Sequence, residues 1–197
     1  MKTQSLSGSP ADARFVVALG GNLPFDGRPP GDTLRAALDF LDESGFALDA
    51  VSGFYSNPAF PRGSGPDFVN AVASFVSDLA PGEVLARLHA AERRFGRERD
   101  LRWGPRTLDL DLVAAGDAVL PDGEAWARWA GLAPDRRGTE APEGLILPHP
   151  RLAERAFVLI PMHDILPAWR HPATGASVAQ MLDALPPADI AELRRLP

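Results

Sequence analysis

Two aspartates separated by a single leucine are the residues of this sequence best suited to chemistry. In the segment 108–112, Asp109 and Asp111 alternate with leucines, which is the two-residue period of a strand with one buried face. A rise of about 3.3 Å per residue puts their Cα atoms roughly 6.6 Å apart on the same face. Carboxylates at this spacing can converge on one divalent cation or on a pair of ions. The simpler alternative is an amphipathic strand whose acids face water.

Arginines are concentrated just before these aspartates. Between residues 93 and 106 six arginines stand against two acids, a local charge of +4, whereas the whole chain carries −6. The six are Arg93, Arg94, Arg97, Arg99, Arg102 and Arg106. Guanidinium groups beside paired carboxylates suit an anionic substrate held partly by arginine and partly by a metal. The pattern therefore indicates a polyphosphate with magnesium.

The composition is that of a globular protein and excludes several functional classes. Its 197 residues, 45% of them hydrophobic, predict a disordered tail over residues 1–13 and one domain over 14–197. A sequence pI near 5.2 argues against a general nucleic-acid or membrane-surface binder. The absence of cysteine excludes disulfides, thiolate zinc sites and a cysteine nucleophile. Without a secretory signal or a long apolar run, we expect a cytoplasmic protein with no membrane span.

A glycine pair follows the first apolar run. Residues 15–19 predict a buried strand, and Gly20, Gly21 and Asn22 come directly after it. A phosphate-binding glycine loop is one interpretation, but the G-x-G-x-x-G pattern and the Walker lysine are both missing. The sequence favours glycines that serve a tight turn.

Periodicity predicts the remaining elements of the first half. We expect a loop over 24–31, a helix capped by Asp32 or Thr33, a strand over 46–56, a mobile loop over 59–66, a strand over 68–76 and a helix from Pro81 to about Gly96. Glu92 lies beside the apolar stripe of this last helix. It could be a surface acid or an acceptor for a substrate hydroxyl, and the sequence leaves both open.

Asn70 is the notable polar residue of the strand over 68–76. Because successive side chains of a strand alternate between its two faces, Asn70 is expected on the same face as Phe68. A flat heterocycle could stack on the ring while the amide bonds its edge. An asparagine satisfied by backbone groups explains the residue equally well.

The second half is less regular. Residues 117–144 form a long insertion that is either a functional lid or partly disordered, with a short helix over 124–129. A short strand over 145–147 leads to Pro148 and Pro150, which flank His149 and hold it in one direction. A helix over 177–185 follows. The order strand, helix, strand, strand, helix, strand predicts an α+β ferredoxin-like sandwich, a mostly antiparallel sheet covered by helices.

Four stretches of this chain resemble the 6-hydroxymethyl-7,8-dihydropterin pyrophosphokinase family. They are residues 18–23 (Ala-Leu-Gly-Gly-Asn-Leu), 54–58 with 68–71, Glu92 through Arg97 to 103–111 (Trp-Gly-Pro-Arg-Thr-Leu-Asp-Leu-Asp), and 148–150 with 155–159. The resemblance implies transfer of pyrophosphate from ATP to the hydroxymethyl group of the pterin, with release of AMP, in folate biosynthesis.

The resemblance also implies a role for individual residues. Asp109 and Asp111 would bind two Mg²⁺ ions that bridge the triphosphate, and Arg97 and Arg106 would join them as catalytic residues. The ATP site would consist of Leu85, Glu92, Arg97, Trp103, Arg106, Leu112, Leu145, Ile146, His149 and Arg155, with Trp103 closing over it. The pterin site would consist of Asn57, Pro58, Phe60, Phe68, Asn70 and Phe157, with the pterin stacked between Phe68 and Phe157.

Three positions differ from the usual family pattern. Members often have serine at Gly21, threonine at Asn57 and tyrosine at Phe68, and none of these changes threatens the chemistry. The insertion at 117–144 is longer than in compact members, so the resemblance implies nothing about its role.

The expected mechanism is in-line attack of the hydroxymethyl oxygen on the β-phosphorus of ATP, catalysed mainly by positioning and electrostatics. A nucleotidyl transferase or cyclase would also pair such aspartates with two metals, but it would release pyrophosphate. A non-catalytic ligand-binding module and an RNA-binding domain are further alternatives, and the latter lacks the interleaved aromatic motifs. We expect a monomer that binds two small substrates, no nucleic acid and no membrane.

Overall fold

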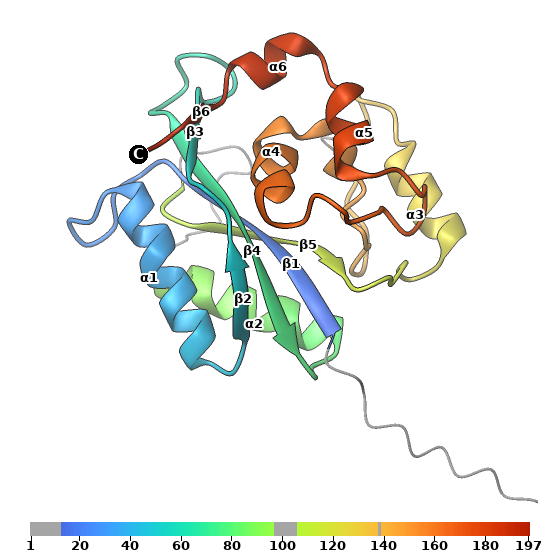
Figure 1. The fold of residues 1–197 in the computed structure, drawn as a ribbon, viewed down its shortest axis with the longest axis horizontal. Coiled ribbons are helices and arrows are strands. Elements are labelled where there is room, and N and C mark those ends of the chain that lie inside the picture. Colours follow the sequence, from blue (N-terminus) through green and yellow to red (C-terminus); the bar gives the residue numbers. More distant parts are fainter. Residues whose placement is uncertain (1–12, 97–105, 138) are drawn as a thin grey trace, which may run out of the picture.

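The computed structural model describes residues 13–96, 106–137 and 139–197 (Figure 1). Its elements are β1 (Ala13–Gly21), α1 (Pro30–Glu43), β2 (Ala47–Val51), β3 (Tyr55–Asn57), β4 (Phe68–Ser77), α2 (Pro81–Arg94), β5 (Asp109–Ala115), α3 (Gly123–Ala130), the 3-10 helix η1 (Leu152–Glu154), α4 (Ala156–Ile165), α5 (Val178–Asp183), α6 (Pro187–Ala191) and β6 (Arg194–Arg195). The predicted N-terminal tail lies outside these residues, except that Ala13 already belongs to β1.

The strands form one antiparallel sheet in the order β5-β1-β4-β3-β6, and β2 also pairs with β4. The predicted strand over 46–56 is therefore wrong as a single element, because it consists of β2 and β3. Between them the Ser52 hydroxyl accepts the Val72 N–H at 2.9 Å, and this side-chain bond interrupts the ladder.

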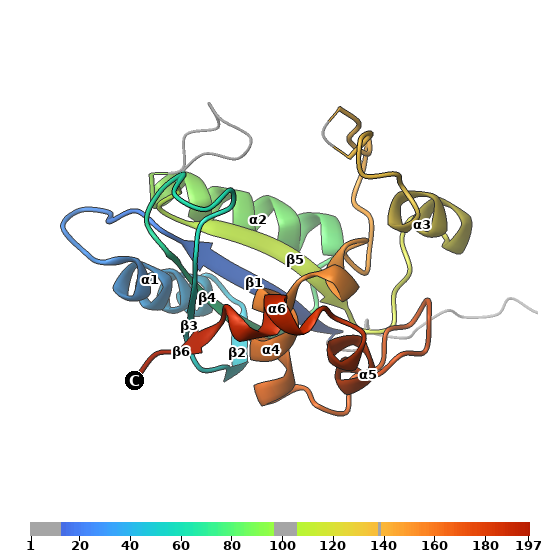
Figure 2. The same ribbon diagram turned by 90° about the horizontal axis from the view of Figure 1, so that it is seen from above.

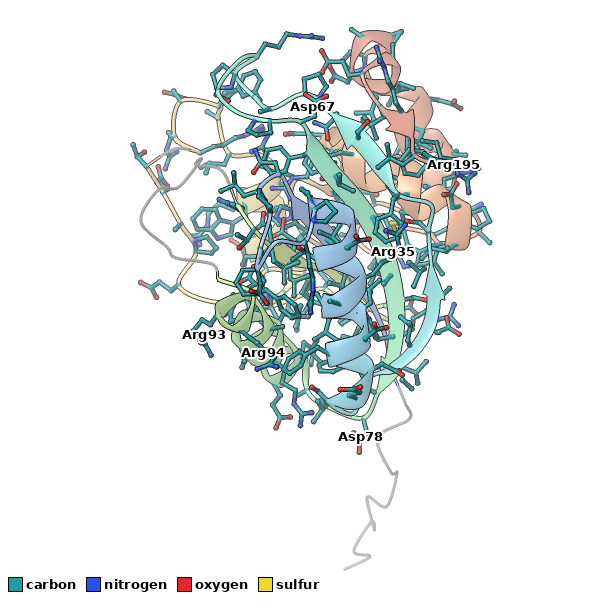
Figure 3. The ribbon with its side chains drawn as sticks, turned by 90° about the vertical axis from the view of Figure 1, so that its left-hand side faces the viewer. Arg35, Asp67, Asp78, Arg93, Arg94 and Arg195 are labelled. Carbon is teal, nitrogen blue, oxygen red and sulfur yellow. The ribbon has the colours of Figure 1, made fainter. Side chains whose placement is uncertain are left out.

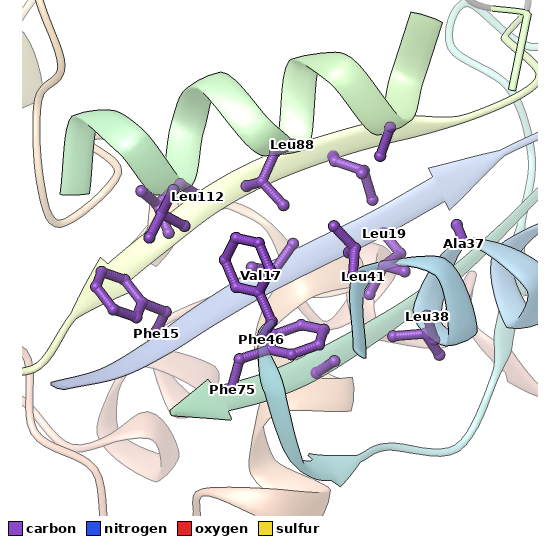
Figure 4. Packing of buried hydrophobic residues seen from close by; sticks show 14 of the residues in the cluster. Phe15, Val17, Leu19, Ala37, Leu38, Leu41, Phe46, Phe75, Leu88 and Leu112 are labelled. Carbon is purple, nitrogen blue, oxygen red and sulfur yellow. The ribbon is translucent and has the colours of Figure 1, made fainter. Parts of the chain in front are cut away.

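Each face of the sheet packs on its own set of helices. The inward residues Phe15, Val17 and Leu19 of β1 pack with α1 and α2 in the first core (Figure 4). The alternate residues, such as Val16, face α4 and α5 in a second core. Figure 2 shows the sheet with α1 and α2 on one side and α4 on the other. The apolar run of β1 is thus buried on both faces, as its sequence predicts.

Two element boundaries differ from the sequence-based expectation. Helix α1 begins at Pro30 after Pro29, so neither Asp32 nor Thr33 is its cap; proline at the first helical position loses no hydrogen bond there. The predicted strand over 145–147 is reduced to a single bridge between Leu120 and Leu147.

Other expectations hold. The short helix over 124–129 is α3, where the Asp122 side chain accepts the N–H of Ala125 at 2.8 Å. The helix over 177–185 is α5, capped by Ser177. No helix within the described ranges is long and apolar enough to cross a bilayer.

Candidate active site

Strand β5 carries the two aspartates on the face of the sheet that α4 covers. Leu110 and Leu112 belong to the first core, under α2, whereas Val113 belongs to the second core. Asp109 and Asp111 alternate with the leucines and project toward the second face, half-buried. The two-residue period read from the sequence is confirmed.

Each carboxylate is paired with an arginine. Asp109 Oδ2 lies 2.6 Å from Arg106 Nη1, and Asp111 Oδ2 lies 2.7 Å from Arg155 Nη1. Burial raises the pKa of the Asp111 carboxyl, but the opposing effects together, led by the charge and the hydrogen bond of the Arg155 guanidinium, lower the pKa below its usual value. Asp111 is therefore a carboxylate, and the two acids share one surface with two guanidinium groups.

The glycine pair holds the backbone beside Arg106. The carbonyl of Arg106 accepts the N–H groups of Asn22 at 2.8 Å and Leu23 at 3.0 Å, and its own N–H donates to Asn22 Oδ1 at 2.8 Å. A Cβ on Gly21 would lie only 2.6 Å from the Thr107 carbonyl oxygen. The backbones can therefore approach this closely because residue 21 is glycine. Both glycines are ladder residues of β1, where Gly20 pairs with Asn70 and Gly21 with Val69, so the predicted tight turn at this pair is wrong.

His149 is anchored on the outer edge of β5. Its N–H donates to the Val113 carbonyl at 2.8 Å, and its Nδ1 accepts the Arg151 N–H at 3.1 Å. Burial lowers the pKa of His149 to about 4, and the positive charge of Arg155 lowers it further than Asp111 raises it. His149 is thus neutral at pH 7, with Nδ1 as acceptor and Nε2–H as donor.

The polar end of β3 and β4 lies on the same face as the aspartates. Asn70 is 5% exposed, and its Nδ2 donates to Asn57 Oδ1 at 2.6 Å. Phe68 pairs with Asn57 in the ladder and is half-buried. The Asn70 amide is thus bonded to a side chain and not to the backbone groups of the simpler alternative, and its binding of a heterocycle stays a prediction.

The other predicted pterin residues lie around this pair. Pro58 follows Asn57 and is half-buried. Phe157 is in the first turn of α4, 37% exposed, and the Arg155 guanidinium lies 5.7 Å from its ring centroid. Phe60 is 87% exposed on the β3–β4 loop, so the structure does not bring it into the group.

Gly20 lies between the two polar ends of the site. In the sheet it pairs with Asn70 of β4 on one side and with Asp109 of β5 on the other. A Cβ on Gly20 would point toward the Asn70 amide, 3.2 Å from its Oδ1. Ala18 has the corresponding place next to Asp111. Because neighbouring strands are about 4.8 Å apart, the amide end and the carboxylate end are separated by roughly 10 Å. The small residues Ala18 and Gly20 of β1 form the surface between them.

The sequence interpretation of Gly20 as a turn residue missed this role. The available signal is that the small residues of β1, at 18 and 20, alternate with large ones at 17 and 19. This alternation leaves room above the sheet on one face only.

Of the predicted adenosine residues, Glu92 bonds the outer edge of β5. Glu92 is 1% exposed, and its Oε1 accepts the Leu110 N–H at 2.8 Å, so the surface-acid alternative is wrong. Leu112 and Ile146 are buried, while Leu85 and Leu145 are partly buried against the first core. Their binding of adenosine stays a prediction.

The arginine cluster is only partly brought to the carboxylates. Arg93 and Arg94 are exposed at the end of α2 (Figure 3), and Arg94 lies 5.4 Å from the Phe40 ring centroid. Of the described arginines in 93–106, Arg106 is the one paired with an aspartate. Arg97 and Trp103 lie outside the described residues.

A cavity of about 430 Å³ lies beside the amide end of the site. Residues Asn57, Pro58 and Asp67 line it on one side, and the C-terminal residues Glu192 and Arg194 line it on the other. Figure 3 labels Asp67 at the end of the molecule where β3 and β4 meet their loop. The paired aspartates do not line this cavity.

Comparison with known proteins decides the family. Residues 16–167 match the 7,8-dihydro-6-hydroxymethylpterin-pyrophosphokinase (HPPK) family, which is more than half of the chain. The chain belongs to this family. The chain is accordingly an ATP-dependent pyrophosphokinase that acts on hydroxymethyldihydropterin in folate biosynthesis, as its sequence predicts.

Curated relatives agree with this family. The 2-amino-4-hydroxy-6-hydroxymethyldihydropteridine pyrophosphokinase of Pseudomonas aeruginosa is 37% identical over 174 residues, which cover 88% of this chain and 92% of the relative. The protein of the same name from Synechocystis is 34% identical over 169 residues, covering 85% and 74%.

Solved structures confirm the ferredoxin-like fold of this HPPK family member. An HPPK-DHPS crystallised with substrates has a TM-score of 0.65 at 12% identity and matches 95% of this chain. The wild-type HPPK-DHPS of Plasmodium falciparum has a TM-score of 0.61 at 14% identity and matches 90%. The chain spans 47% and 42% of those chains.

Proposed function

We propose that the two substrates of the pyrophosphokinase lie end to end on the α4 face of the sheet. The triphosphate of ATP would lie over β5 and the pterin over β3 and β4. The observation that carries this proposal is the row Asn70, Gly20, Asp109, in which a neutral amide and a carboxylate flank a residue without a side chain. In this arrangement the pyrophosphoryl group is transferred across the position of Gly20, while the rest of each substrate stays at its own end.

Asp109 and Asp111 fit a magnesium site. Mg²⁺ is usually held by one or two carboxylates, with water and substrate phosphates as the other ligands. Within the described part of the chain no group of three or more His, Cys, Asp or Glu residues forms a metal site of its own. Two aspartates that leave ligand positions to the triphosphate suit this chemistry. Two bound Mg²⁺ ions would neutralise phosphate charge and orient the reacting groups.

The cationic and neutral donors around the aspartates would hold the triphosphate. Arg106 and Arg155 already lie within hydrogen-bond distance of the two carboxylates, so both guanidinium groups border the same space. His149 would donate Nε2–H to a phosphate oxygen as a neutral group. Arg97 and Trp103 are assigned to this end by the family resemblance alone.

The pterin end is neutral and partly aromatic. Phe68 and Phe157 would stack on the heterocycle, and Asn57 and Asn70 would bond its edge. The remaining assignments are Pro58 and Phe60 beside the pterin, and Leu85, Glu92, Leu112, Leu145 and Ile146 around adenosine.

The reaction is a single displacement at phosphorus. The hydroxymethyl oxygen bonds to the β-phosphorus and loses its proton to solvent, while the bond from that phosphorus to the α–β bridging oxygen breaks and AMP leaves with the bridging oxygen. Positioning of the two substrates and stabilisation of charge by Arg106 and Arg155 supply the catalysis. We further propose that a single domain over 14–197 does this as a cytoplasmic monomer.

A product assay tests which phosphorus atom of ATP is attacked. Purified protein with Mg²⁺, ATP and hydroxymethyldihydropterin is expected to form AMP and the pterin diphosphate in equal amounts. Pyrophosphate as the product would instead indicate a nucleotidyl transferase and overturn the proposed alignment of ATP.

A further inference from the structure

The insertion over residues 117–144 contacts the segment that carries two of the proposed ATP-binding residues. That segment, residues 148–155, begins just before His149 and ends at Arg155. The family resemblance gives the insertion no role. Its contacts to 148–155 come at both ends of the segment.

The first contact is made by a tryptophan of α3. Trp126 Nε1 donates to the Pro148 carbonyl at 2.9 Å. The next residue, His149, donates its N–H to the Val113 carbonyl of β5 at 2.8 Å. The peptide that leads into His149 is thus held by the insertion on one side and by the catalytic strand on the other. The Trp126 ring is itself packed on buried His171, with ring centroids 4.9 Å apart.

The second contact is made by an arginine near the end of the insertion. Arg137 Nη1 donates to Glu154 Oε2 at 2.7 Å, and Arg137 Nε donates to the Leu132 carbonyl at 2.7 Å. Glu154 Oε2 also accepts Arg151 Nε at 3.2 Å. Because Glu154 directly precedes Arg155, this network holds the backbone from which Arg155 reaches Asp111.

We propose that Trp126 and Arg137 are positioning residues that align His149 and Arg155 with the triphosphate. Neither touches the carboxylates, so both act through the 148–155 segment. The proposal rests on the proposed ATP-binding roles of His149 and Arg155. It gives the insertion the task of making the ATP end of the site rigid, since donors that are already oriented lose less conformational freedom on binding.

Two matched pairs of variants test the inference by steady-state kinetics with AMP detection. Trp126→Phe removes the indole N–H but keeps an aromatic ring, and Trp129→Phe is its control on the same helix. We expect Trp126→Phe to raise the KM for ATP about three- to tenfold, the range of one ordinary hydrogen bond. The KM for the pterin is expected to stay unchanged, and the control should alter neither value.

The second pair separates Arg137 from its neighbour in sequence. Arg137→Gln loses the ion pair with Glu154, whereas Arg136→Gln loses only a pair with Glu140 inside the insertion. We expect Arg137→Gln to raise the KM for ATP and Arg136→Gln to leave it unchanged. If Trp126→Phe does not fold, this second pair of variants still tests the inference.

A double variant distinguishes failure of the inference from failure of the proposed site. If Trp126 acts through His149, Trp126→Phe should have little further effect in a His149→Ala background. An undiminished effect there, equal rises in both KM values, or kinetics like those of the controls would overturn the inference. An unchanged KM for ATP in His149→Ala itself would instead refute the proposed role of His149.

Discussion

The two ends of the site are built on strands that lie on opposite sides of β1, and they differ in charge and in the side chains that form them. At the β5 end, two carboxylates are paired with two guanidinium groups, at 2.6 and 2.7 Å. At the β3–β4 end, two neutral amides bond each other at 2.6 Å beside an aromatic ring. Gly20 lies between them. The difference teaches that a single sheet face can present a charged end and a neutral end, with a residue without a side chain between them.

The largest expected effect comes from removing charge at the β5 end. Asp109→Asn or Asp111→Asn keeps the shape of the side chain but weakens its hold on a cation, so turnover should fall on the order of a thousandfold. Pterin binding, measured by calorimetry, should remain. Asp117→Asn, an exposed acid just beyond β5, is the control. Normal turnover in either site variant would refute the metal assignment.

The next largest effect is expected from a substitution that weakens the neutral end alone. Asn70→Ala removes an amide that is almost fully buried, and we expect the pterin dissociation constant to rise about tenfold with no change for an ATP analogue. Ser74→Ala is the control, because Ser74 is on the same face of β4 but bonds Asp49. Equal loss of both ligands would show that the two ends are not separate.

A smaller effect is expected from filling the space between the ends. In Gly20→Ala the new Cβ would lie 3.2 Å from Asn70 Oδ1, so the amide must shift by a few tenths of an ångström. We expect the KM for the pterin to rise about threefold. Gly82→Ala on α2, where a Cβ meets nothing within 4 Å, is the control. An unchanged KM for the pterin would mean that Gly20 does not separate the ends.

The two ends also differed in how well the sequence predicted them. The β5 end was readable because its information is local: Asp109, Asp111 and Arg106 lie within six residues, and strand periodicity puts both acids on one face. Arg155, 44 residues from Asp111, was connected to it only through the family resemblance. The pairing of Asn70 with Asn57 and the place of Gly20 depend on strand register, which no local pattern reports.

The errors in the predicted fold have similarly specific causes. Residues 46–56 have the apolar content of one strand, and the break at Ser52 depends on a hydrogen bond to Val72, on another strand. The cap of α1 was misplaced because Asp32 is a good cap residue in isolation, whereas Pro30 is already helical. The insertion could not be predicted to hold Pro148, because the partner of the Trp126 indole lies 22 residues away.

The smallest expected effect concerns stability at the β5 end, through the histidine on which Trp126 packs. Burial lowers the pKa of His171, which lies between the Trp126 and Trp169 rings with its Nδ1 accepting the Ala173 N–H. The unfolded chain, with a histidine pKa of about 6.5, therefore binds this proton more readily than the folded chain. The free energy of unfolding should thus decrease as the pH falls below about 6.5, by at most about 1.4 kcal/mol per pH unit.

Thermal unfolding between pH 5 and pH 8 measures this contribution. We expect His171→Gln to flatten the fall in Tm on acidification, whereas His163→Gln, an exposed histidine of α4, should leave the slope as it is. Because Trp126 packs on His171 and also bonds Pro148, acidification should loosen the β5 end first. Tryptophan fluorescence of a variant with Trp103→Phe, Trp129→Phe and Trp169→Phe, in which Trp126 alone remains, should then change at a higher pH than the affinity for the pterin does. A simultaneous change in both would contradict the separation of the two ends.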